Sequence, residues 1–336
     1  MLTFIWATPS EGTDVGELSD RIQFAAAPVS WGVQDDPGPA WEQSFERVLD
    51  EIVSAGYTGT ELGPYSFFPT DPRVLAESLD RRGMSLLSSF VPVPIADPSR
   101  KTKVIEHVRK VGTLLSALGS KLLVVSDRQT PKRQVLAGRV PVDGRESLTG
   151  EQWKQVASTV AEIENAAGEF GLRLVFHPHV ATYVETPMEV ERLFESLAST
   201  QVGLCLDTGH CVYGGGDPVE EARKYRSLLR YVHIKDINAR TLGEARRAGL
   251  SFEQAVGAGV FSSIGDGSID FDGFFRLMAQ EAYSGWMVVE QDVIYGKTKI
   301  PPVDSMRSSL KYLKNVVASL ESSTPVRRRN ANPRPV

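Results

Sequence analysis

The sequence predicts one α/β domain with the architecture of a (β/α)8 TIM barrel, and three observations support this expectation. Short apolar runs alternate with helical segments eight times without a break, which is typical of a parallel sheet that closes into a barrel. No GxGxxG motif follows a predicted strand into a helix, so an open, doubly wound dinucleotide-binding sheet is the less favoured alternative. The chain has 336 residues, 41% hydrophobic and 24% charged, and is long enough for one such domain.

The first half of the chain contains the first four expected strands. Each is a short apolar run that ends on polar residues or on proline. They are expected at 22–27, 58–63, 84–90 and 121–127. Three segments of helical periodicity lie between them, and each stops at a glycine, as helices commonly do. These helices are expected at 41–55, 72–82 and 100–118.

The second half continues the alternation after an interruption. Residues 128–147 are polar and lack clear periodicity, and a loop of that length inside a compact domain is usually a lid or a binding loop. The remaining strands are expected at 172–179, 202–207, 231–236 and 285–292. The remaining helices are expected at 150–168, 187–197, 217–229 and 303–320.

The two ends of the chain are expected to lie outside the barrel, which we place at residues 21–320. Residues 1–20 show no sustained periodicity and are expected to form a flexible arm. Residues 321–336 combine prolines and arginines with little apolar surface to bury, so we expect a disordered tail.

Composition limits the partners of the protein. The formal net charge is -5, so no overall basic field attracts nucleic acid or an anionic membrane, and neither is expected as a partner. With only two cysteines, Cys205 and Cys211, a disulfide framework is not expected. No run approaches ~18 apolar residues, and the first residues lack the cationic start of a signal peptide. These features predict a cytoplasmic protein that acts on a small molecule.

Polar and ionisable side chains gather where the predicted strands end. In a barrel these ends meet at one face, and that face carries the active site. Four of the five histidines lie there, His107 being the exception. For any single residue the alternative is a structural role, such as capping a loop. The strand-end residues are Trp31, Glu61, Ser88, Ser126 with Asp127, His177 with His179, Asp207 with His210, His233 with Lys235, and Glu290 with Asp292.

A metal site is predicted among these residues. Asp207, His233 and Glu290 end the sixth, seventh and eighth strands, and a mixed nitrogen and oxygen ligand set suits a first-row divalent metal. One ligand from the fifth strand would complete the set and leave positions open for water or substrate, as in catalytic sites. The candidates for it are His177, by its position, and its competitors His179 and Glu185.

Seven segments together resemble the xylose-isomerase-like barrel superfamily of sugar isomerases and epimerases, and most of all its inosose dehydratases. They are APVSWGV, GTELGPYSFFP, HPHVATYVETP, LCLDTGH, YVHIKD, GVFSSIGDGSIDF and GWMVVEQD, and the match spans about residues 22–315. The resemblance implies a divalent metal (manganese, cobalt or magnesium, with zinc possible) and a keto-sugar or keto-cyclitol substrate. A homo-oligomer or a partner subunit is compatible with it.

The sequence departs from that family at two places. Epimerases of the superfamily carry a metal-binding glutamate at the fifth strand, where this chain has His177, so either the histidine replaces it or Glu185 reaches in. The continuation of the eighth strand, EQDVIYGKTKIPP, also differs from the inosose dehydratase pattern. The second departure leaves the substrate open.

For the chemistry itself we expect proton abstraction next to a ketone, with a metal stabilising the enolate. General acid–base groups alone typically contribute ~10²–10⁴-fold, so the metal ligands rank above the bases. The expected catalytic residues are His179, His210, Lys235 and Glu185, and the expected substrate-binding residues are Glu61, Trp31 and Ser126. The alternative role of Lys235 is only to neutralise Asp207 or Asp236.

Several reactions share such a site. Loss of hydroxide gives a dehydratase, which we favour, and return of the proton gives an isomerase or epimerase. Departure of an aryl carbon would make the chain a C-glycoside-cleaving lyase subunit acting on a 3-keto-glycoside. A metal-dependent endonuclease is disfavoured by the acidic net charge. A non-catalytic sugar-binding subunit is the remaining alternative.

Overall fold

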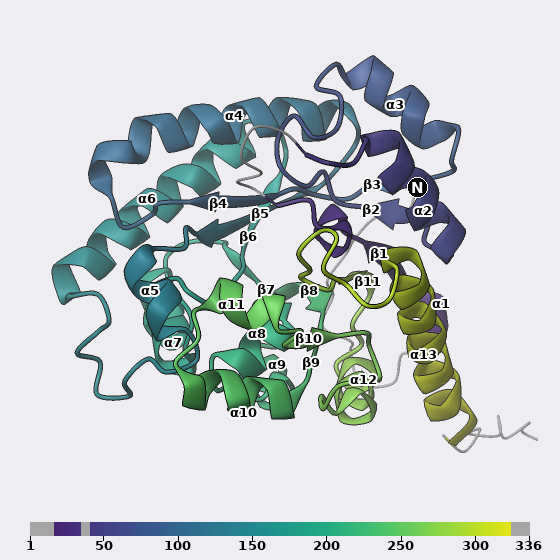
Figure 1. Ribbon diagram of the computed structural model, residues 1–336. Helices are drawn as coiled ribbons and strands as arrows, with labels where there is room; N and C mark the ends of the chain where they lie inside the picture. The colour runs from purple at the N-terminus through teal and green to yellow at the C-terminus, as the bar shows by residue number, and fades with distance from the viewer. Residues whose placement is uncertain (1–16, 35–40, 324–336) are drawn as a thin grey trace, which may run out of the picture.

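The computed structural model describes residues 17–34 and 41–323, and within them nine parallel strands form one sheet (Figure 1). The strand order is β3-β2-β1-β11-β8-β7-β6-β5-β4. The strands are β1 (Ile22–Ala26), β2 (Gly59–Thr60), β3 (Ser85–Leu86), β4 (Phe90–Val93), β5 (Leu122–Asp127), β6 (Arg173–Phe176), β7 (Gly203–Asp207), β8 (Leu229–Ile234) and β11 (Gly285–Val289).

The two ends of this sheet meet within one stretch of chain. Strands β3 and β4 are separated by only three residues, and together they occupy the place of the third predicted strand. On one side the Leu62 N–H donates to the Ser88 carbonyl, and on the other the Val124 N–H donates to the Ser89 carbonyl. The sheet therefore closes into a ring of eight chain segments, which confirms the predicted barrel.

Helices follow the strands around the outside, as the alternation predicts. Helix α6 has the expected bounds, whereas α2 starts four residues late because the Ser44 hydroxyl accepts from the Arg47 N–H and caps it there. Helix α9 is shorter than expected, because the chain turns at Tyr225 and enters β8 at Leu229. The helices on the outside are α2 (Phe45–Ala55), α3 (Pro72–Asp80), α4 (Lys101–Ala117), α6 (Gly150–Gly168), α7 (Pro187–Ser196), α9 (Pro218–Lys224), α12 (Phe271–Gln280) and α13 (Pro302–Ser323).

Further elements, which the alternation does not predict, cover part of the barrel mouth. They have their own apolar cluster, formed by residues such as Tyr213, Leu242, Phe252 and Phe261, and we call this layer the cap. In Figure 1 its helices lie together on one side of the strands. It consists of α5 (Pro131–Leu136), α8 (Thr208–Tyr213), α10 (Ala239–Ala248), α11 (Phe252–Gly257) and the antiparallel pair β9 (Asp236–Ile237) and β10 (Phe261–Ser262).

Asp236 ties the cap to the barrel. Its carboxylate is fully buried and accepts five backbone N–H groups at 2.8 to 3.2 Å. The donors are Ile237, Gly265, Gly267, Ser268 and Ile269. A Cβ atom at Gly267 would lie 2.2 Å from the carboxylate, so only glycine permits this approach. The GDGS segment is therefore folded around one side chain.

The described ends of the chain pack on each other. Helix α1 (Leu18–Arg21) contacts α13, and the Ser19 N–H donates to Glu321. The short stretch 17–20, expected to belong to an arm, is thus docked, while the rest of that arm (1–16) and most of the expected tail (324–336) lie outside the described residues. In the part of the chain that the structure describes, no helix combines the length and apolarity that crossing a membrane requires.

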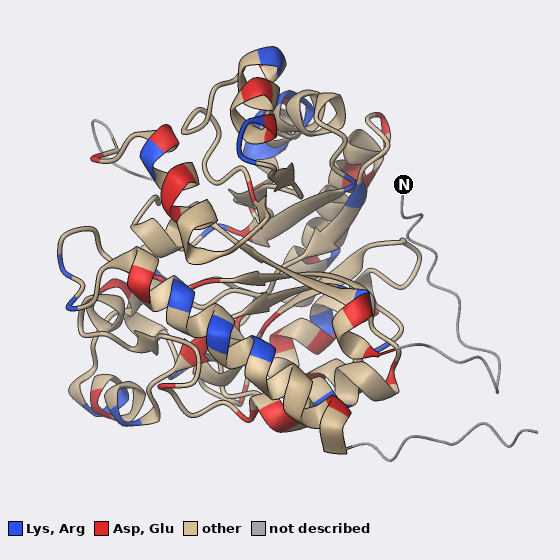
Figure 2. Cartoon of the chain, turned by 90° about the vertical axis from the view of Figure 1, so that its right-hand side faces the viewer, with Lys and Arg blue, Asp and Glu red and all other residues tan. Residues whose placement is uncertain are grey.

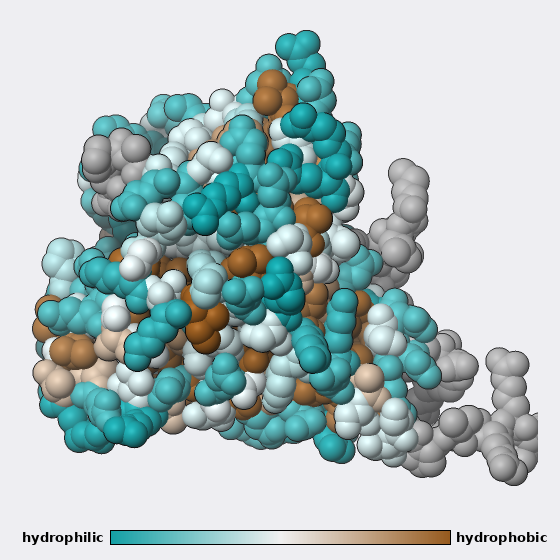
Figure 3. Space-filling model, turned by 45° about the vertical axis from the view of Figure 1, so that its right-hand side comes forward, coloured by the Kyte–Doolittle hydropathy of each residue, from teal (hydrophilic) through white to brown (hydrophobic). Residues whose placement is uncertain are grey.

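The surface is mixed in character. In Figure 2, acidic and basic residues are interspersed along the helices. On the face shown in Figure 3, apolar atoms occur as separate spots among polar ones, which is usual for a folded protein.

We expect Asp236→Asn to lower the free energy of unfolding by about 2–4 kcal/mol, because the new amide group would face N–H donors that now have an acceptor. Asp217→Asn is the matched control, since Asp217 caps an exposed helix end where asparagine is an equally good cap. Urea denaturation of both variants tests this, and equal small losses would contradict the anchoring role.

Candidate active site

The polar residues at the strand ends share one position in the barrel. The barrel interior is filled by residues that include Val124, Val175, Cys205, Tyr231 and Val288. Two residues further along each strand, on the same face, come Ser126, His177, Asp207, His233 and Glu290. All five are buried. One ring of apolar side chains is thus followed directly by one ring of polar side chains at the mouth of the barrel.

Asp207 is held by the start of a helix. It is the N-cap of α8, and its Oδ1 accepts the backbone N–H of His210 at 2.7 Å. Its Oδ2 faces the ring, 3.5 Å from His177 Nε2 and 3.2 Å from Lys235 Nζ. One oxygen therefore fixes the orientation of the carboxylate and the other is directed to the site.

His233 lies between two carboxylates. Its Nε2 is 3.2 Å from Glu61 Oε1, and its Nδ1 is 3.3 Å from Glu290 Oε2. Glu61 in turn accepts from the Ser88 hydroxyl at 2.6 Å. Burial acts to lower the pKa of His233, but Cys205, Glu290 and Glu61 outweigh it and raise that pKa well above its ordinary value. Glu61 thus orients His233 from behind, which is the usual arrangement for a histidine that binds a metal through its other nitrogen.

Lys235 brings an ammonium group into the ring. Its Nζ lies 3.2 Å from Asp207 Oδ2, 3.2 Å from Glu290 Oε2 and 2.9 Å from Asp292 Oδ1. Burial acts to lower the pKa of Lys235, yet these carboxylates raise it above its ordinary value. The side chain passes over Gly209, where a Cβ atom would lie 2.8 Å from Lys235 Cγ. The glycine of the LDTGH segment therefore makes room for the lysine.

The ring fits a divalent cation. Three of the four candidate ligands have a buried atom that makes no hydrogen bond in the described chain. These atoms are His177 Nδ1, Asp207 Oδ2, which lies 3.2 Å from Lys235 Nζ, and His233 Nδ1, which lies 3.3 Å from Glu290 Oε2. Three buried carboxylates, those of Glu61, Asp207 and Glu290, lie at the ring, and Asp292, whose side chain is 12% exposed, adds a fourth negative group beside the ammonium of Lys235. Buried negative charge in excess of positive charge is costly unless a cation balances it.

Two further histidines lie beside the ring. The rings of His179 and His210 are 3.8 Å apart between centroids, and Phe252 packs against both. Burial lowers the pKa of His179 to about 3 and that of His210 well below its ordinary value, so both are neutral near pH 7. His179 Nδ1 lies 2.7 Å from the Val180 carbonyl and so carries the proton, which leaves Nε2 as an acceptor.

A cavity of about 750 Å³ opens above these residues, a size typical for small-molecule sites. The barrel contributes Glu61, His177, Lys235 and Glu290 to its wall. The cap and the neighbouring loops contribute groups that include Gln34, Asp127, Gln129, Gln134, Ser251, Phe252, Glu253 and Asp292. Asp127 and Asp292 were expected among the strand-end residues, whereas sequence reasoning gave no role to the others, because no periodicity marks a loop residue that faces a cavity.

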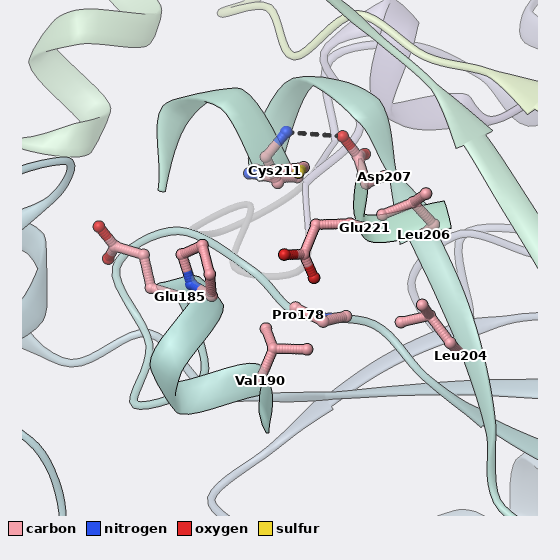
Figure 4. A pocket seen from close by; sticks show the side chains of 10 residues that line it. Pro178, Glu185, Val190, Leu204, Leu206, Asp207, Cys211 and Glu221 are labelled. Atoms are coloured by element: carbon pink, nitrogen blue, oxygen red, sulfur yellow. Dashed lines mark hydrogen bonds between the residues drawn. The ribbon is translucent and has the colours of Figure 1, made fainter. Parts of the chain in front are cut away.

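Glu185 does not reach this cavity. Its two oxygens accept the N–H groups of Gly138 and Ala181 at 2.6 and 2.8 Å, and its nearest cation is the Arg133 guanidinium at 3.8 Å. It borders a separate cavity of about 20 Å³, room for about one water molecule, and Figure 4 shows its carboxylate pointing away from Asp207. The structure therefore does not bring Glu185 to the ring, and both of its oxygens accept backbone N–H groups.

Trp31 and Ser126 are also not part of the cavity wall. The Trp31 ring is fully buried in the core between sheet and helices, and its indole N–H donates to Glu51 on α2. Ser126 faces the barrel interior, and its hydroxyl has no hydrogen-bond partner in the described chain. Of the three expected substrate-binding residues, Glu61 alone lines the cavity, where it also orients His233.

Comparison with known proteins agrees with this geometry. The family described as "Xylose isomerase-like TIM barrel" matches residues 49–316. The inosose dehydratase of Clostridium botulinum (strain Alaska E43 / Type E3) is 32% identical over 279 residues, which cover 82% of this chain and 91% of that protein.

Two solved structures share the fold. The IolI protein with a bound zinc atom has a TM-score of 0.66 at 17% identity, covering 88% of this chain and 98% of that one. An L-ribulose 3-epimerase has a TM-score of 0.65 at 17% identity, covering 91% and 99%. At these identities the likeness concerns the fold. By the family match and the relatives above 30% identity, the chain belongs to the xylose isomerase-like TIM barrel family, within which it is similar to inosose dehydratases.

Proposed function

We propose that the protein is a metal-dependent lyase that removes water from a keto-cyclitol or keto-sugar, as inosose dehydratases do. The observation that carries the proposal is the pairing, at one cavity, of a cation-binding ring with a neutral histidine and a protonated lysine. The relative of 32% identity, which this chain covers over nine-tenths of its length, supports the same reaction class.

Asp207, His233, Glu290 and His177 would hold the cation, for which manganese, cobalt, magnesium and zinc are candidates. All four lie in the ring at the barrel mouth. The zinc atom of the IolI structure supports a divalent metal in this fold. When bound, the cation would stabilise the negative charge that develops on the ketone oxygen during proton abstraction.

The chain's own residues would move the protons. His179 Nε2 is an acceptor in a neutral imidazole, which suits a base that takes the proton from the carbon next to the ketone. Lys235 keeps its proton, which suits an acid that protonates the departing hydroxyl as water. The unprotonated Nε2 of His179 and the protonated Nζ of Lys235 line the same cavity, and this difference in protonation state supports the proposed roles.

Epimerisation is the second candidate function. It needs the same proton abstraction, followed by return of a proton to the same carbon. The fold shared with L-ribulose 3-epimerase supports epimerisation as the second candidate.

Incubation of the metal-loaded protein with 2-keto-myo-inositol in deuterium oxide tests the proposal. We expect loss of water to an unsaturated ketone, seen by ultraviolet absorbance and mass spectrometry. Exchange of the α hydrogen without elimination would favour the epimerase, and the absence of both with metal bound would overturn the assigned chemistry.

Substitutions should separate metal binding from proton transfer. We expect Asp207→Asn to weaken Mn²⁺ binding by more than about 100-fold and to lose activity with it, since it removes a charged ligand. His210→Asn should keep Mn²⁺ affinity within about threefold, because the His210 backbone N–H still fixes Asp207, while kcat falls by about 10²–10³-fold. Calorimetry measures the Mn²⁺ affinity and steady-state kinetics measure kcat. Full activity in Asp207→Asn would contradict the assignment of Asp207 as a metal ligand.

The buried neutral His179 predicts a pH dependence of stability. Its pKa is lowered from 6.5 to about 3, so the unfolded chain binds a proton there before the folded one does. This contribution to stability is complete above pH 6.5 and is lost as the pH falls toward 3. We expect the free energy of unfolding of the metal-free protein to fall between pH 6.5 and pH 4.5. For His179→Gln this fall should be about 2 kcal/mol smaller than for the wild type. Equal slopes in urea denaturation would contradict it.

A further inference from the structure

Lys235 contacts three carboxylates, and two of them belong to proposed metal ligands. In this structure its ammonium contacts Asp207, Glu290 and Asp292, and lies 3.1 Å from His210 Nε2. The side chain is buried, its stem is confined by Gly209, and its ammonium lies 5.2 Å from the centre of the Phe261 ring. The group therefore cannot escape into solvent when the charges around it change.

Asp207 and Glu290 are also two of the proposed metal ligands. The atoms that face Lys235, Asp207 Oδ2 and Glu290 Oε2, are the atoms that face the ring. A carboxylate oxygen that binds a divalent cation has less charge to offer an ammonium, and the two cations repel each other. Metal binding must therefore shift Lys235 toward whatever acceptors remain.

Asp292 is the carboxylate that remains. Its Oδ1 is 2.9 Å from Lys235 Nζ and its Oδ2 is 3.6 Å from His210 Nε2, and it borders the cavity with its side chain 12% exposed. The preceding residue, Gln291, fixes its position. The Gln291 N–H donates to Ser30, and its side chain bonds Phe261 and Ser305.

We propose that Asp292 is a positioning residue that draws the Lys235 ammonium away from Asp207 and Glu290, which frees these ligands for the cation and aims the lysine at the substrate cavity. The inference rests on the proposed function and adds to it a residue to which neither the metal set nor the proton-transfer set assigns a part. It also predicts that Asp292 governs metal affinity without binding the metal.

A second metal at His179, His210 and Asp292 is the competing explanation. Ligand atoms of these three residues lie within 4.8 Å of one another. However, the Lys235 ammonium already contacts Asp292 and His210, so a cation placed there would meet a buried positive charge. The lysine occupies the position that such a metal would need.

A double-mutant cycle with Mn²⁺ tests the proposal on the full-length, metal-free protein. In the wild-type background we expect Asp292→Asn to weaken Mn²⁺ binding by about tenfold, because Lys235 then stays on Asp207 and Glu290. In the Lys235→Met background the same change should weaken binding by less than about threefold, since no ammonium competes. Asp127→Asn is the matched control, because Asp127 is a buried cavity carboxylate whose Oδ2 accepts from the Tyr183 N–H. It should show no such coupling.

Kinetics give a second readout. At saturating Mn²⁺, Asp292→Asn should lower kcat by about tenfold or more with little change in KM, and Asp292→Glu should restore part of the loss. If Asp292→Asn does not fold, as judged by thermal unfolding, Asp292→Ser takes its place in both experiments.

The outcomes are distinguishable. Equal weakening of Mn²⁺ binding in both backgrounds would overturn the positioning role and leave Asp292 as a simple charge near the metal. A Mn²⁺ stoichiometry of two that falls to one in Asp292→Asn would favour the second metal. A wild-type protein that binds no Mn²⁺, or an Asp207→Asn variant that binds it as tightly, would overturn the proposed metal site itself.

Discussion

The balance of buried charge at the barrel mouth is the constraint on which the rest of the structure depends. The buried carboxylates of Glu61, Asp207 and Glu290 lie close to the buried ammonium of Lys235 and to the partly exposed Asp292, and such a group is stable only if every charge has a partner. The helix cap on Asp207, the histidine between Glu61 and Glu290, and the close approach of Gly209 to Lys235 all serve this balance. The apolar side chains of the barrel interior exclude water from one side of these charged groups.

The barrel and the ring of polar residues could be predicted from the sequence, because both depend on strand periodicity. In each strand the last interior residue precedes the polar one by two positions, and this alternation is visible without a structure in LCLD, YVHIK and VVE. The resemblance to the xylose-isomerase-like barrels rests on the same segments, and the family match agrees with it. Asp292 was recognised as a strand-end residue, but its contact with Lys235 depends on the path of the chain after β11.

What the sequence did not predict depends on contacts between segments far apart in the chain. The cap elements are short, and α5 and α11 have six residues each, too few for a clear period. Glu185 follows a strand end and carries a ligand-competent group, yet Gly138 and Ala181 claim both oxygens. Trp31 donates its indole N–H to Glu51 on α2 and does not line the cavity. For Glu185 and Trp31, the hydrogen bonds with Gly138 and Glu51 join segments 47 and 20 residues apart, and no local pattern encodes such a bond.

The Arg133–Glu189 pair has a consequence for how this enzyme family can be altered. Arg133, in the cap helix α5, and Glu189, at the start of α7, are fully buried and joined by two hydrogen bonds of 2.8 Å. Removing Arg133 would leave the buried Glu189 without its cation, and removing Glu189 would leave Arg133 with Glu185 at 3.8 Å. The segment after β5 and the start of α7 are therefore coupled. A chimera that takes the segment after β5 from a relative should fold only if its α7 provides a carboxylate that pairs with the arginine. Natural variation of the cavity wall is expected to follow the same linkage.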